Sequence, residues 1–172
     1  MSMEHLELVP LSSEHLLALI EGEEPFEACF GRPPAPGLRG FFTSEEVSPA
    51  WLLQLHASSG SDPWVHGLAI VHREGGAVIG TVGFKGPPDD DGVVEIAYGI
   101  VPAYEGRGYA SEAVRAALDF ALGHDAVRRV RAHTLPAENA STRVLRKCGF
   151  QKLGSFEDPE DGVVWRFERS RD

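Results

Sequence analysis

The chain has 172 residues, of which 42% are hydrophobic and 24% are charged, and its 26 acidic and 16 basic side chains give a net charge of −10. This composition is typical of a globular protein and excludes wholesale disorder, and the length suits one compact domain. A strong negative charge repels the phosphate backbone, so no nucleic-acid partner is expected.

The N-terminus and the cysteine content bear on the cellular compartment. No apolar run approaches the roughly 20 residues that a membrane span requires. Residues 1–5 (MSMEH) lack the basic and apolar regions of a signal peptide. Cys29 and Cys148 are too few for a disulfide framework. We therefore expect a cytoplasmic protein without membrane association.

The first half of the chain is predicted to combine short strands with helices. Ser12 can cap one helix, and Ser48 followed by Pro49 is typical of the start of another. Gly75 and Gly76 indicate a hairpin turn between two strands. The expected elements are strands at 6–9, 64–72 and 77–85, helices from 12 and from 48 to about 58, and a loop-dominated, proline-rich segment at 24–40.

The second half continues the mixture of strands and helices. Its longest expected helix carries alanine, valine and leucine at helical spacing, which marks one apolar face. The expected elements are strands at 93–100, 127–134, 151–156 and 162–168, and helices from a glycine-rich turn to about 122 and at 138–147. No repeat or linker divides the chain, so residues 1–172 are expected to form a single domain of mixed α and β structure.

The most informative stretch is 93–115 (VVEIAYGIVPAYEGRGYASEAVR), in which a strand leads through a glycine-rich turn, 105–110, into a helix. The first backbone N–H groups of a helix have no partner within it, and together with the helix dipole they favour an anion. Glycines let a ligand approach the backbone. The turn is therefore interpreted as a pyrophosphate cradle. A plain helix cap is the alternative, whereas a Rossmann fingerprint would require a third glycine.

Two motifs resemble those of the GNAT superfamily of acyl-CoA-dependent N-acyltransferases, and more specifically its RimJ/RimL-like branch. The first is 103–113 (AYEGRGYASEA), which is similar to the pyrophosphate loop of that family, and the second is 139–150 (NASTRVLRKCGF), which is similar to its late helix. The resemblance implies a mixed, mostly antiparallel sheet of about six or seven strands flanked by helices and splayed at the acyl-CoA site. It also implies transfer of an acetyl group from acetyl-CoA, as co-substrate, to a primary amine.

The resemblance also implies which residues contact the cofactor. Backbone groups of the splayed strand from Tyr98 to Val101 would bind the pantetheine arm, and the amide of Ile100 or Val101 would polarise the thioester carbonyl. Glu105 stands where the family usually has Gln or Arg, so its side chain is expected to turn outward while Arg107 supplies positive charge. The cofactor-binding candidates are Ile100, Val101, Glu105, Gly106, Arg107, Gly108, Tyr109, Ala110, Ser111, Asn139 and Thr142.

Acyl transfer requires a base for the amine and a proton donor for the leaving thiolate. Glu95 is the candidate base, since burial on a small, apolar strand face would raise its pKa, and a rim glutamate in a cross-strand pair is the alternative. The tyrosine that many members use as donor is replaced by Leu145, so Ser141 is the candidate donor and Thr142 the second choice. N-capping is the alternative role for Asn139 and Ser141.

The acceptor is expected to be a cationic amine, either a small molecule or a protein N-terminus. Residues 26–51, the loop 85–92 and the closing hairpin would wall its site. Aromatic and acidic residues of this wall include Phe26, Phe30, Phe41, Phe42, Glu45, Glu46, Asp89, Asp90 and Asp91. Trp51 and Trp64 are expected in the core. The scattered histidines show no metal-site spacing, so no metal is expected, and the protein would be a monomer or a homodimer. The alternative functions are a non-catalytic acyl-CoA-binding or sensing module and a protein-interaction domain.

Overall fold

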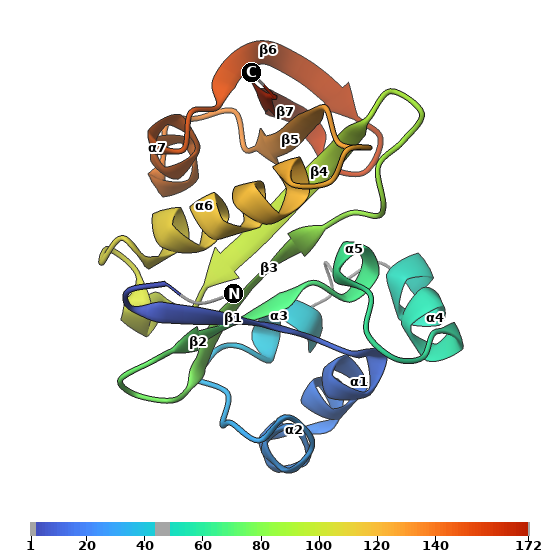
Figure 1. Ribbon diagram of the computed structural model, residues 1–172, viewed down its shortest axis with the longest axis vertical. Helices are drawn as coiled ribbons and strands as arrows, with labels where there is room; N and C mark the ends of the chain where they lie inside the picture. Colours follow the sequence, from blue (N-terminus) through green and yellow to red (C-terminus); the bar gives the residue numbers. More distant parts are fainter. Residues whose placement is uncertain (1–2, 44–48, 172) are drawn as a thin grey trace.

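The computed structural model describes residues 3–43 and 49–171, and one seven-stranded sheet lies at its centre (Figure 1). The strand order is β1-β2-β3-β4-β5-β7-β6. Neighbouring strands are antiparallel except β4 and β5, which run parallel. This confirms the expected mixed, mostly antiparallel sheet. The strands are β1 (Leu6–Pro10), β2 (Leu68–His72), β3 (Val78–Phe84), β4 (Val93–Ile100), β5 (Arg129–Thr134), β6 (Gln151–Asp158) and β7 (Gly162–Ser170).

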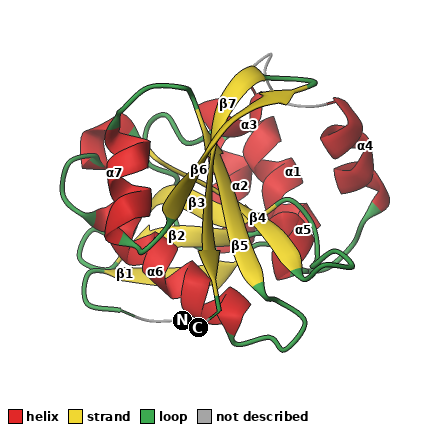
Figure 2. Ribbon diagram, turned by 90° about the horizontal axis from the view of Figure 1, so that it is seen from above, coloured by secondary structure: helices red, strands yellow, loops and turns green. Residues whose placement is uncertain are grey.

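Helices flank the sheet on both sides. Figure 1 shows α1 to α5 gathered beside β1–β3 and α7 beside β5–β7, and Figure 2 shows α6 and α7 on the side of the strands opposite to α1–α5. None of the helices in the described part of the chain is both long and apolar enough to cross a membrane. The helices are α1 (Ser13–Glu21), α2 (Glu23–Phe30), α3 (Gly40–Thr43), α4 (Pro49–Ala57), α5 (Pro63–His66), α6 (Tyr109–Leu122) and α7 (Ala140–Lys147), with a 3-10 turn, η1 (Pro102–Tyr104), before α6.

Helix α6 anchors the core. Its buried side chains Ala113, Val114, Ala117 and Leu118 form the apolar face that the sequence predicted, and the helix contacts β1, β3, β4 and β5. Three alanines on this helix, at 113, 117 and 121, are fully buried, and such small side chains let the helix pack closely on the sheet. The position of the N-terminus of α6, and of the glycine-rich turn before it, is therefore fixed by the core.

One segment differs from the expectation. Residues 63–66 form α5 instead of extending the strand that begins at Leu68, because the Asp62 side chain accepts a hydrogen bond from the Trp64 N–H and Pro63 takes the first helical position. The loop-dominated, proline-rich segment contains one short helix, α2, which is capped by Gly31 with a φ of +93°. Ser48, the predicted cap of α4, lies outside the described residues.

Candidate active site

Strands β4 and β5 separate in the middle of the sheet. They pair only where Val93–Glu95 lies beside Arg129–Arg131, although β4 continues to Ile100. Beyond Glu95, none of the described strands pairs with β4 on that edge. A cavity of about 140 Å³ occupies this gap, and its lining includes Glu95, Tyr98, His133, Ser141 and Leu145. The expected splay is present, and it brings the two sequence-predicted catalytic residues, Glu95 and Ser141, to one cavity.

The backbone at the end of β4 corrects one prediction. The Val101 N–H donates to the carbonyl of Ile79 at 2.9 Å, so it belongs to the β3 side and the amide role predicted for Val101 is wrong. Backbone groups alternate between the two edges of a strand. Ile100 therefore directs its N–H toward the gap, and it is the remaining backbone candidate near the thioester.

The glycine-rich turn has the geometry of an anion-binding loop. Gly106 and Gly108 have φ values of +75° and +82°, a region that glycine adopts without strain. Within the described residues, no hydrogen bond of the N–H groups of 106–111 is found, and Glu112 donates the first helical bond, to the Gly108 carbonyl. These amides lie at the N-terminus of the fourteen-residue helix α6. A diphosphate fits this donor set.

The side chains around the glycine-rich turn differ in how freely a ligand could reach them. Glu105 and Arg107 are both exposed, and the Arg107 guanidinium lies 5.5 Å from the Tyr104 ring centroid. The Tyr109 hydroxyl is hydrogen-bonded to His72 at 3.1 Å. Ser111 is buried and its carbonyl accepts a hydrogen bond from the Cys148 thiol, so Ser111 offers a ligand its backbone N–H rather than its side chain.

Helix α7 begins with a reciprocal cap. The Asn139 side chain accepts from the Thr142 N–H, and the Thr142 hydroxyl accepts from the Asn139 N–H and donates to Glu138. Thr142 is completely buried, so its predicted side-chain contacts with the cofactor or the leaving sulfur are wrong. Asn139 has the capping role that the sequence offered as the alternative. Ser141 is exposed and lines the cavity, and no hydrogen bond of its hydroxyl is found among the described residues.

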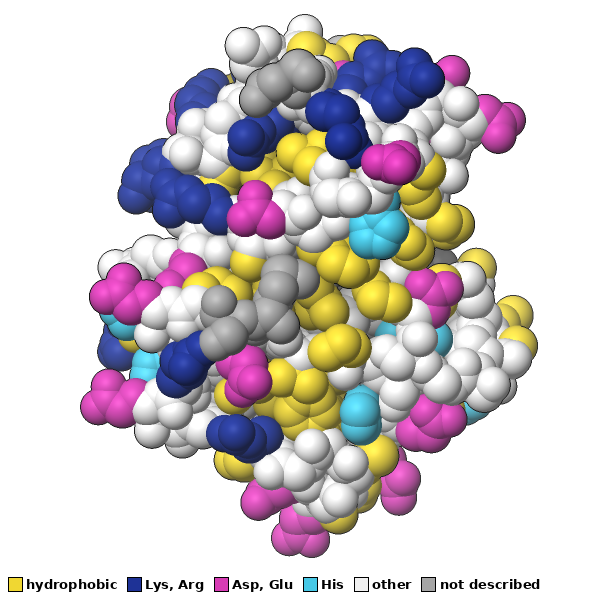
Figure 3. Space-filling model, in the orientation of Figure 1, with side chains coloured by type: hydrophobic (Ala, Val, Ile, Leu, Met, Phe, Trp, Pro, Cys, Tyr) yellow, Lys and Arg dark blue, Asp and Glu magenta, His cyan; other side chains and the backbone are white. Residues whose placement is uncertain are grey.

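Cationic side chains gather near α7. Arg143, Arg146 and Lys147 are exposed on this helix, and Figure 3 shows Lys and Arg side chains concentrated over the same upper half of the molecule, whereas acidic side chains are found over both halves. This distribution produces locally positive potential in a chain of net charge −10. A phosphorylated ligand can therefore approach the α6 and α7 side despite the overall charge.

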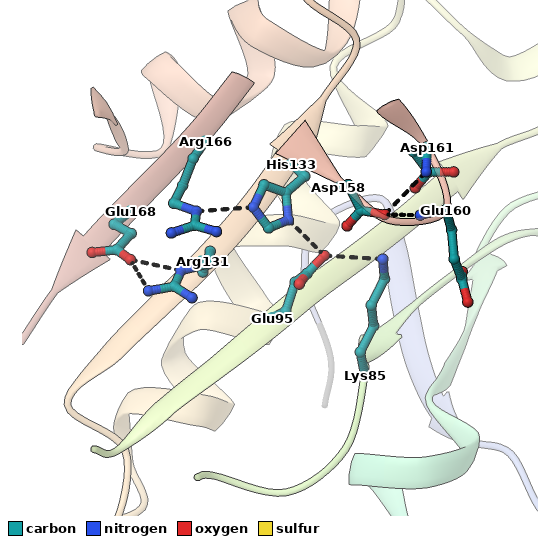
Figure 4. A network of polar contacts seen from close by, with 9 residues as sticks. All are labelled: Lys85, Glu95, Arg131, His133, Asp158, Glu160, Asp161, Arg166 and Glu168. Atoms are coloured by element: carbon teal, nitrogen blue, oxygen red, sulfur yellow. Dashed lines mark hydrogen bonds and ion pairs between the residues drawn. The ribbon is translucent and has the colours of Figure 1, made fainter. Parts of the chain in front are cut away.

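Glu95 lies in a line of charged and hydrogen-bonded side chains (Figure 4). Its Oε2 is 3.0 Å from the Lys85 ammonium and 3.0 Å from His133 Nδ1. The Arg166 Nε–H donates to His133 Nε2 at 3.0 Å. Because arginine can only donate, His133 accepts at Nε2 and donates from Nδ1 to the carboxylate. The hydrogen bond from Arg166 thus orients the His133 ring so that Nδ1 faces Glu95.

This network overturns the expected pKa of Glu95. Burial by itself would raise the pKa of the carboxyl, but the hydrogen bonds from His133 and Lys85 and the positive charge of Lys85 outweigh it, and the pKa is lowered from its ordinary value. The carboxylate is therefore ionised at neutral pH. The cross-strand pairing that the sequence offered as the alternative is present, since His133 lies on the neighbouring strand β5.

The side chain of Tyr98 belongs to the site, although only the backbone of this residue was expected there. It lines the cavity, and its hydroxyl donates to the Ser141 carbonyl at 3.3 Å. Burial raises the pKa of Tyr98 to about 12, partly offset by this hydrogen bond. This contact joins β4 to α7, which are far apart in the sequence. Leu145 is completely buried beside Tyr98.

A second, larger cavity of about 600 Å³ shares Lys85 and Ala97 with the first. Phe41, Phe42, Trp51 and Trp64 line it, so the expected role of Phe41 and Phe42 is supported and the two tryptophans are not simply core residues.

Several other residues predicted to wall the acceptor lie elsewhere. Phe26 is completely buried and stacks on Phe30, and Asp89 accepts hydrogen bonds from backbone N–H groups of its own loop. Asp90 and Asp91 line a separate surface hollow. The acidic lining comes instead from Glu160 and Asp161, in the turn between β6 and β7. Glu45 and Glu46 lie outside the described residues.

Comparison with known proteins identifies a family. A family model described as an acetyltransferase (GNAT) domain matches residues 5–151. Uncharacterized N-acetyltransferase YjdG of Bacillus subtilis (strain 168) is 29% identical over 99 residues, which cover 58% of this chain and 56% of that protein. N-alpha-acetyltransferase RimI of Mycobacterium tuberculosis (strain ATCC 25618 / H37Rv) is 29% identical over 130 residues, covering 67% of this chain and 78% of that protein. The match thus spans about half the length of YjdG.

Solved structures give the same fold. RimL, the ribosomal L7/L12 alpha-N-protein acetyltransferase in complex with coenzyme A, superposes with a TM-score of 0.67 at 18% identity, covering 99% of this chain and 96% of that one. The aminoglycoside acetyltransferase AAC(6')-Ib in complex with coenzyme A and kanamycin gives 0.64 at 19% identity, with 96% and 95% covered. At these identities the likeness establishes the fold.

Proposed function

This chain belongs to the GNAT acetyltransferase family, and from that membership we propose that it transfers an acetyl group from acetyl-CoA to a primary amine at the cavity between β4 and β5. Coenzyme A would supply the activated acetyl thioester. RimI and RimL are named for protein N-termini and AAC(6')-Ib for aminoglycosides, so an amine acceptor is common to these relatives. The cytoplasm, where acetyl-CoA would be available, suits a protein with two free cysteines.

One arrangement carries this proposal. The N–H groups of 106–111, for which no acceptor is found among the described residues, stand at the N-terminus of α6, and α6 packs on β4. The part of β4 beyond Glu95, which pairs with β5 nowhere in the described chain, lines the cavity that holds Glu95. The amides of the turn would hold the diphosphate, and backbone groups at Ile100 would bind the pantetheine arm and polarise the thioester carbonyl. Arg107 and the cations of α7 would add positive charge. The domain formed by residues 1–172 would thus contain both the cofactor site and the acceptor site.

Glu95 would act on the acceptor. Its ionised carboxylate attracts an ammonium group and takes one proton from it, directly or through a water molecule. A lowered pKa makes the carboxylate a weaker base than the sequence suggested, but it ensures that the group is ready to accept a proton at neutral pH. His133 and Arg166 would hold the carboxylate in place.

Ser141 would protonate the leaving sulfur, because its side chain lines the cavity and is exposed. Tyr98, bonded to the Ser141 carbonyl, would position it. In the complete exchange the ammonium group first gives one proton to Glu95, which passes it to solvent. The amine nitrogen then bonds to the acetyl carbon and loses its second proton to Glu95. The carbon–sulfur bond breaks, and the sulfur leaves as a thiol with a proton from Ser141, which solvent replaces.

The test combines turnover with cofactor binding. Purified protein is mixed with acetyl-CoA and a panel of primary amines, and thiol release is followed with a thiol reagent. Glu95→Gln is expected to lower kcat/KM by about 100- to 10,000-fold while the Kd for CoA from calorimetry is unchanged. Glu74→Gln, in the exposed turn between β2 and β3, is the matched control. CoA binding without thiol release from any amine would instead favour a non-catalytic acyl-CoA-binding module.

A further inference from the structure

The cavity of about 600 Å³ is a slot lined by aromatic side chains and by residues of β3 and β4. Phe42 and Trp51 stack at 5.7 Å between ring centroids, and Trp64 and Phe84 meet at 4.9 Å. The small residues Gly83 and Ala97, which pair across β3 and β4, also line the slot. Flat rings pack favourably against aromatic walls of this kind.

The uncharged polar groups of the slot are few. The buried His66 accepts a hydrogen bond at Nδ1 from the Asp62 N–H, and its Nε2 is hydrogen-bonded to the Ser58 hydroxyl. Both ring nitrogens of His66 are therefore already hydrogen-bonded within the protein. Of the described lining residues, this leaves the side chains of Gln54 and Thr81 and the indole N–H groups of Trp51 and Trp64 as uncharged polar groups available to a ligand. A body rich in hydroxyl groups would lose its hydration there with little compensation.

The charged lining residues of the slot lie in one region, which is the region where the slot meets the smaller cavity. Lys85 borders both cavities and its ammonium contacts Glu95. Glu160 and Asp161 line the slot nearby, and Figure 4 shows the turn that carries them on the same side of Glu95 as Lys85. The carboxylates outnumber Lys85, so this region favours a cation.

From this arrangement we infer that the acceptor is a primary amine carried on a flat aromatic body, and this inference rests on the proposed function. The ring would lie against Phe42 and Trp51, and the ammonium group would displace Lys85 from Glu95. A free arylalkylamine and a peptide with an N-terminal aromatic residue share this chemistry. The slot is large enough for either.

Substrate comparison tests the inference with the full chain and acetyl-CoA. We expect kcat/KM to be at least about tenfold higher for 2-phenylethylamine than for n-butylamine or glucosamine, since tenfold corresponds to the ~1.4 kcal/mol that one aromatic contact supplies. Tripeptides beginning with phenylalanine or serine form the second arm. A preference for the phenylalanine peptide over 2-phenylethylamine identifies a peptide N-terminus, and the reverse order identifies a free amine.

The outcomes separate this inference from the proposed function. Turnover of several amines without an aromatic preference overturns the inference and leaves the acetyltransferase proposal intact. No thiol release from any amine overturns both.

A variant pair tests where the ring binds. Trp51→Ala is expected to raise the KM for 2-phenylethylamine about tenfold and that for n-butylamine less than about twofold, and Trp51→Phe is expected to restore most of the loss. Leu53→Ala is the matched control, because Leu53 lies on the same helix with 73% exposure and does not line the slot. If Trp51→Ala does not fold, Trp51→Leu, which keeps apolar volume without a flat ring, provides the same comparison. Equal changes for both amines would overturn the inference.

Discussion

The Lys85 ammonium lies 3.0 Å from Glu95 Oε2, on the carboxylate that an incoming ammonium would need. Hydrogen bonding to Glu95 and the negative charges of Glu95, Asp161 and Asp158 outweigh the effect of burial and raise the pKa of Lys85. Lys85 therefore stays charged at neutral pH. In the proposed reaction it competes with the acceptor for Glu95.

Replacing this competitor should improve acceptor binding. The Lys85 side chain is 58% exposed, so its pair with Glu95 is worth about 1 kcal/mol or less. Lys85→Met should therefore lower the KM for the amine by up to about fivefold, with a smaller change in kcat. Steady-state kinetics with varied amine measures this. Arg32→Met, a change of the same kind at an exposed site, is the control. A higher KM in Lys85→Met would mean that Lys85 helps to bind the acceptor.

The pH profile should respond to His133. The hydrogen bond from His133 helps to hold the pKa of Glu95 below its ordinary value, so its removal raises that pKa. Because the proposed base must be ionised, activity is lost as pH falls through the pKa of Glu95. His133→Ala should therefore lose kcat/KM at a higher pH than the unaltered protein does. The measurement is kcat/KM against pH on the acidic side.

Arg166→Gln provides the comparison for His133. It removes the donor to His133 Nε2 but leaves the bond from Nδ1 to Glu95 available. The pH at which kcat/KM is lost on the acidic side should therefore shift less in Arg166→Gln than in His133→Ala. If kcat/KM falls at the same pH in the unaltered protein, His133→Ala and Arg166→Gln, then Glu95 does not control the loss of activity on the acidic side.

The parts predicted well from the sequence are those determined by local signals. Strand β4 was expected at 93–100 and is found at Val93–Ile100, because its apolar run is bounded by turn residues on both sides. The end of α6 at Leu122 follows from periodicity and a following glycine. The glycine-rich turn was identified because Gly106 and Gly108 precede a helix, the position where positive φ values and free N–H groups coincide.

The remaining features depend on contacts between distant parts of the chain. The pKa of Glu95 depends on Lys85, from the segment after β3, and on His133, from β5. Neither contact can be predicted from the residues next to Glu95 in the sequence. Residues 64–66 were assigned to a strand because Trp64 and Val65 favour strands, whereas the cap at Asp62 and Pro63 was the stronger signal. Local propensity did not identify the acidic lining by Glu160 and Asp161.

The two hydroxyl groups of the smaller cavity can be distinguished by a pair of variants. Ser141→Ala should lower kcat by about tenfold or more, as expected on removal of a proton donor, and leave the KM for the amine nearly unchanged. Tyr98→Phe should have a smaller effect, because its hydroxyl makes one long hydrogen bond to the Ser141 carbonyl. Both are measured by steady-state kinetics. A larger loss in Tyr98→Phe than in Ser141→Ala would reassign the proton donor to Tyr98.

Tyr98 should also influence stability at high pH. Its folded-state pKa of about 12 lies above the ordinary value of 10.0, so folding favours the protonated form. The free energy of unfolding should therefore decrease as the pH rises from the ordinary pKa to the raised one, where the unfolded chain ionises first. Tyr98→Phe should flatten this decrease in denaturant titrations. An unchanged slope in the variant would show that the loss comes from other groups.

The glycine-rich turn can be tested without reference to any acceptor. Gly108 has a φ of +82° and open space where a Cβ would stand, so Gly108→Ala introduces backbone strain without a clash. The strain is about 1–2 kcal/mol, and relief of it would reorient the N–H groups that precede α6. The Kd for CoA from calorimetry should therefore rise by about tenfold. Gly31→Ala, at a φ of +93° with equally open space at the end of α2, should lower the free energy of unfolding similarly but leave CoA binding unchanged. If both variants weaken CoA binding equally, general destabilisation explains the effect and the turn does not bind the diphosphate.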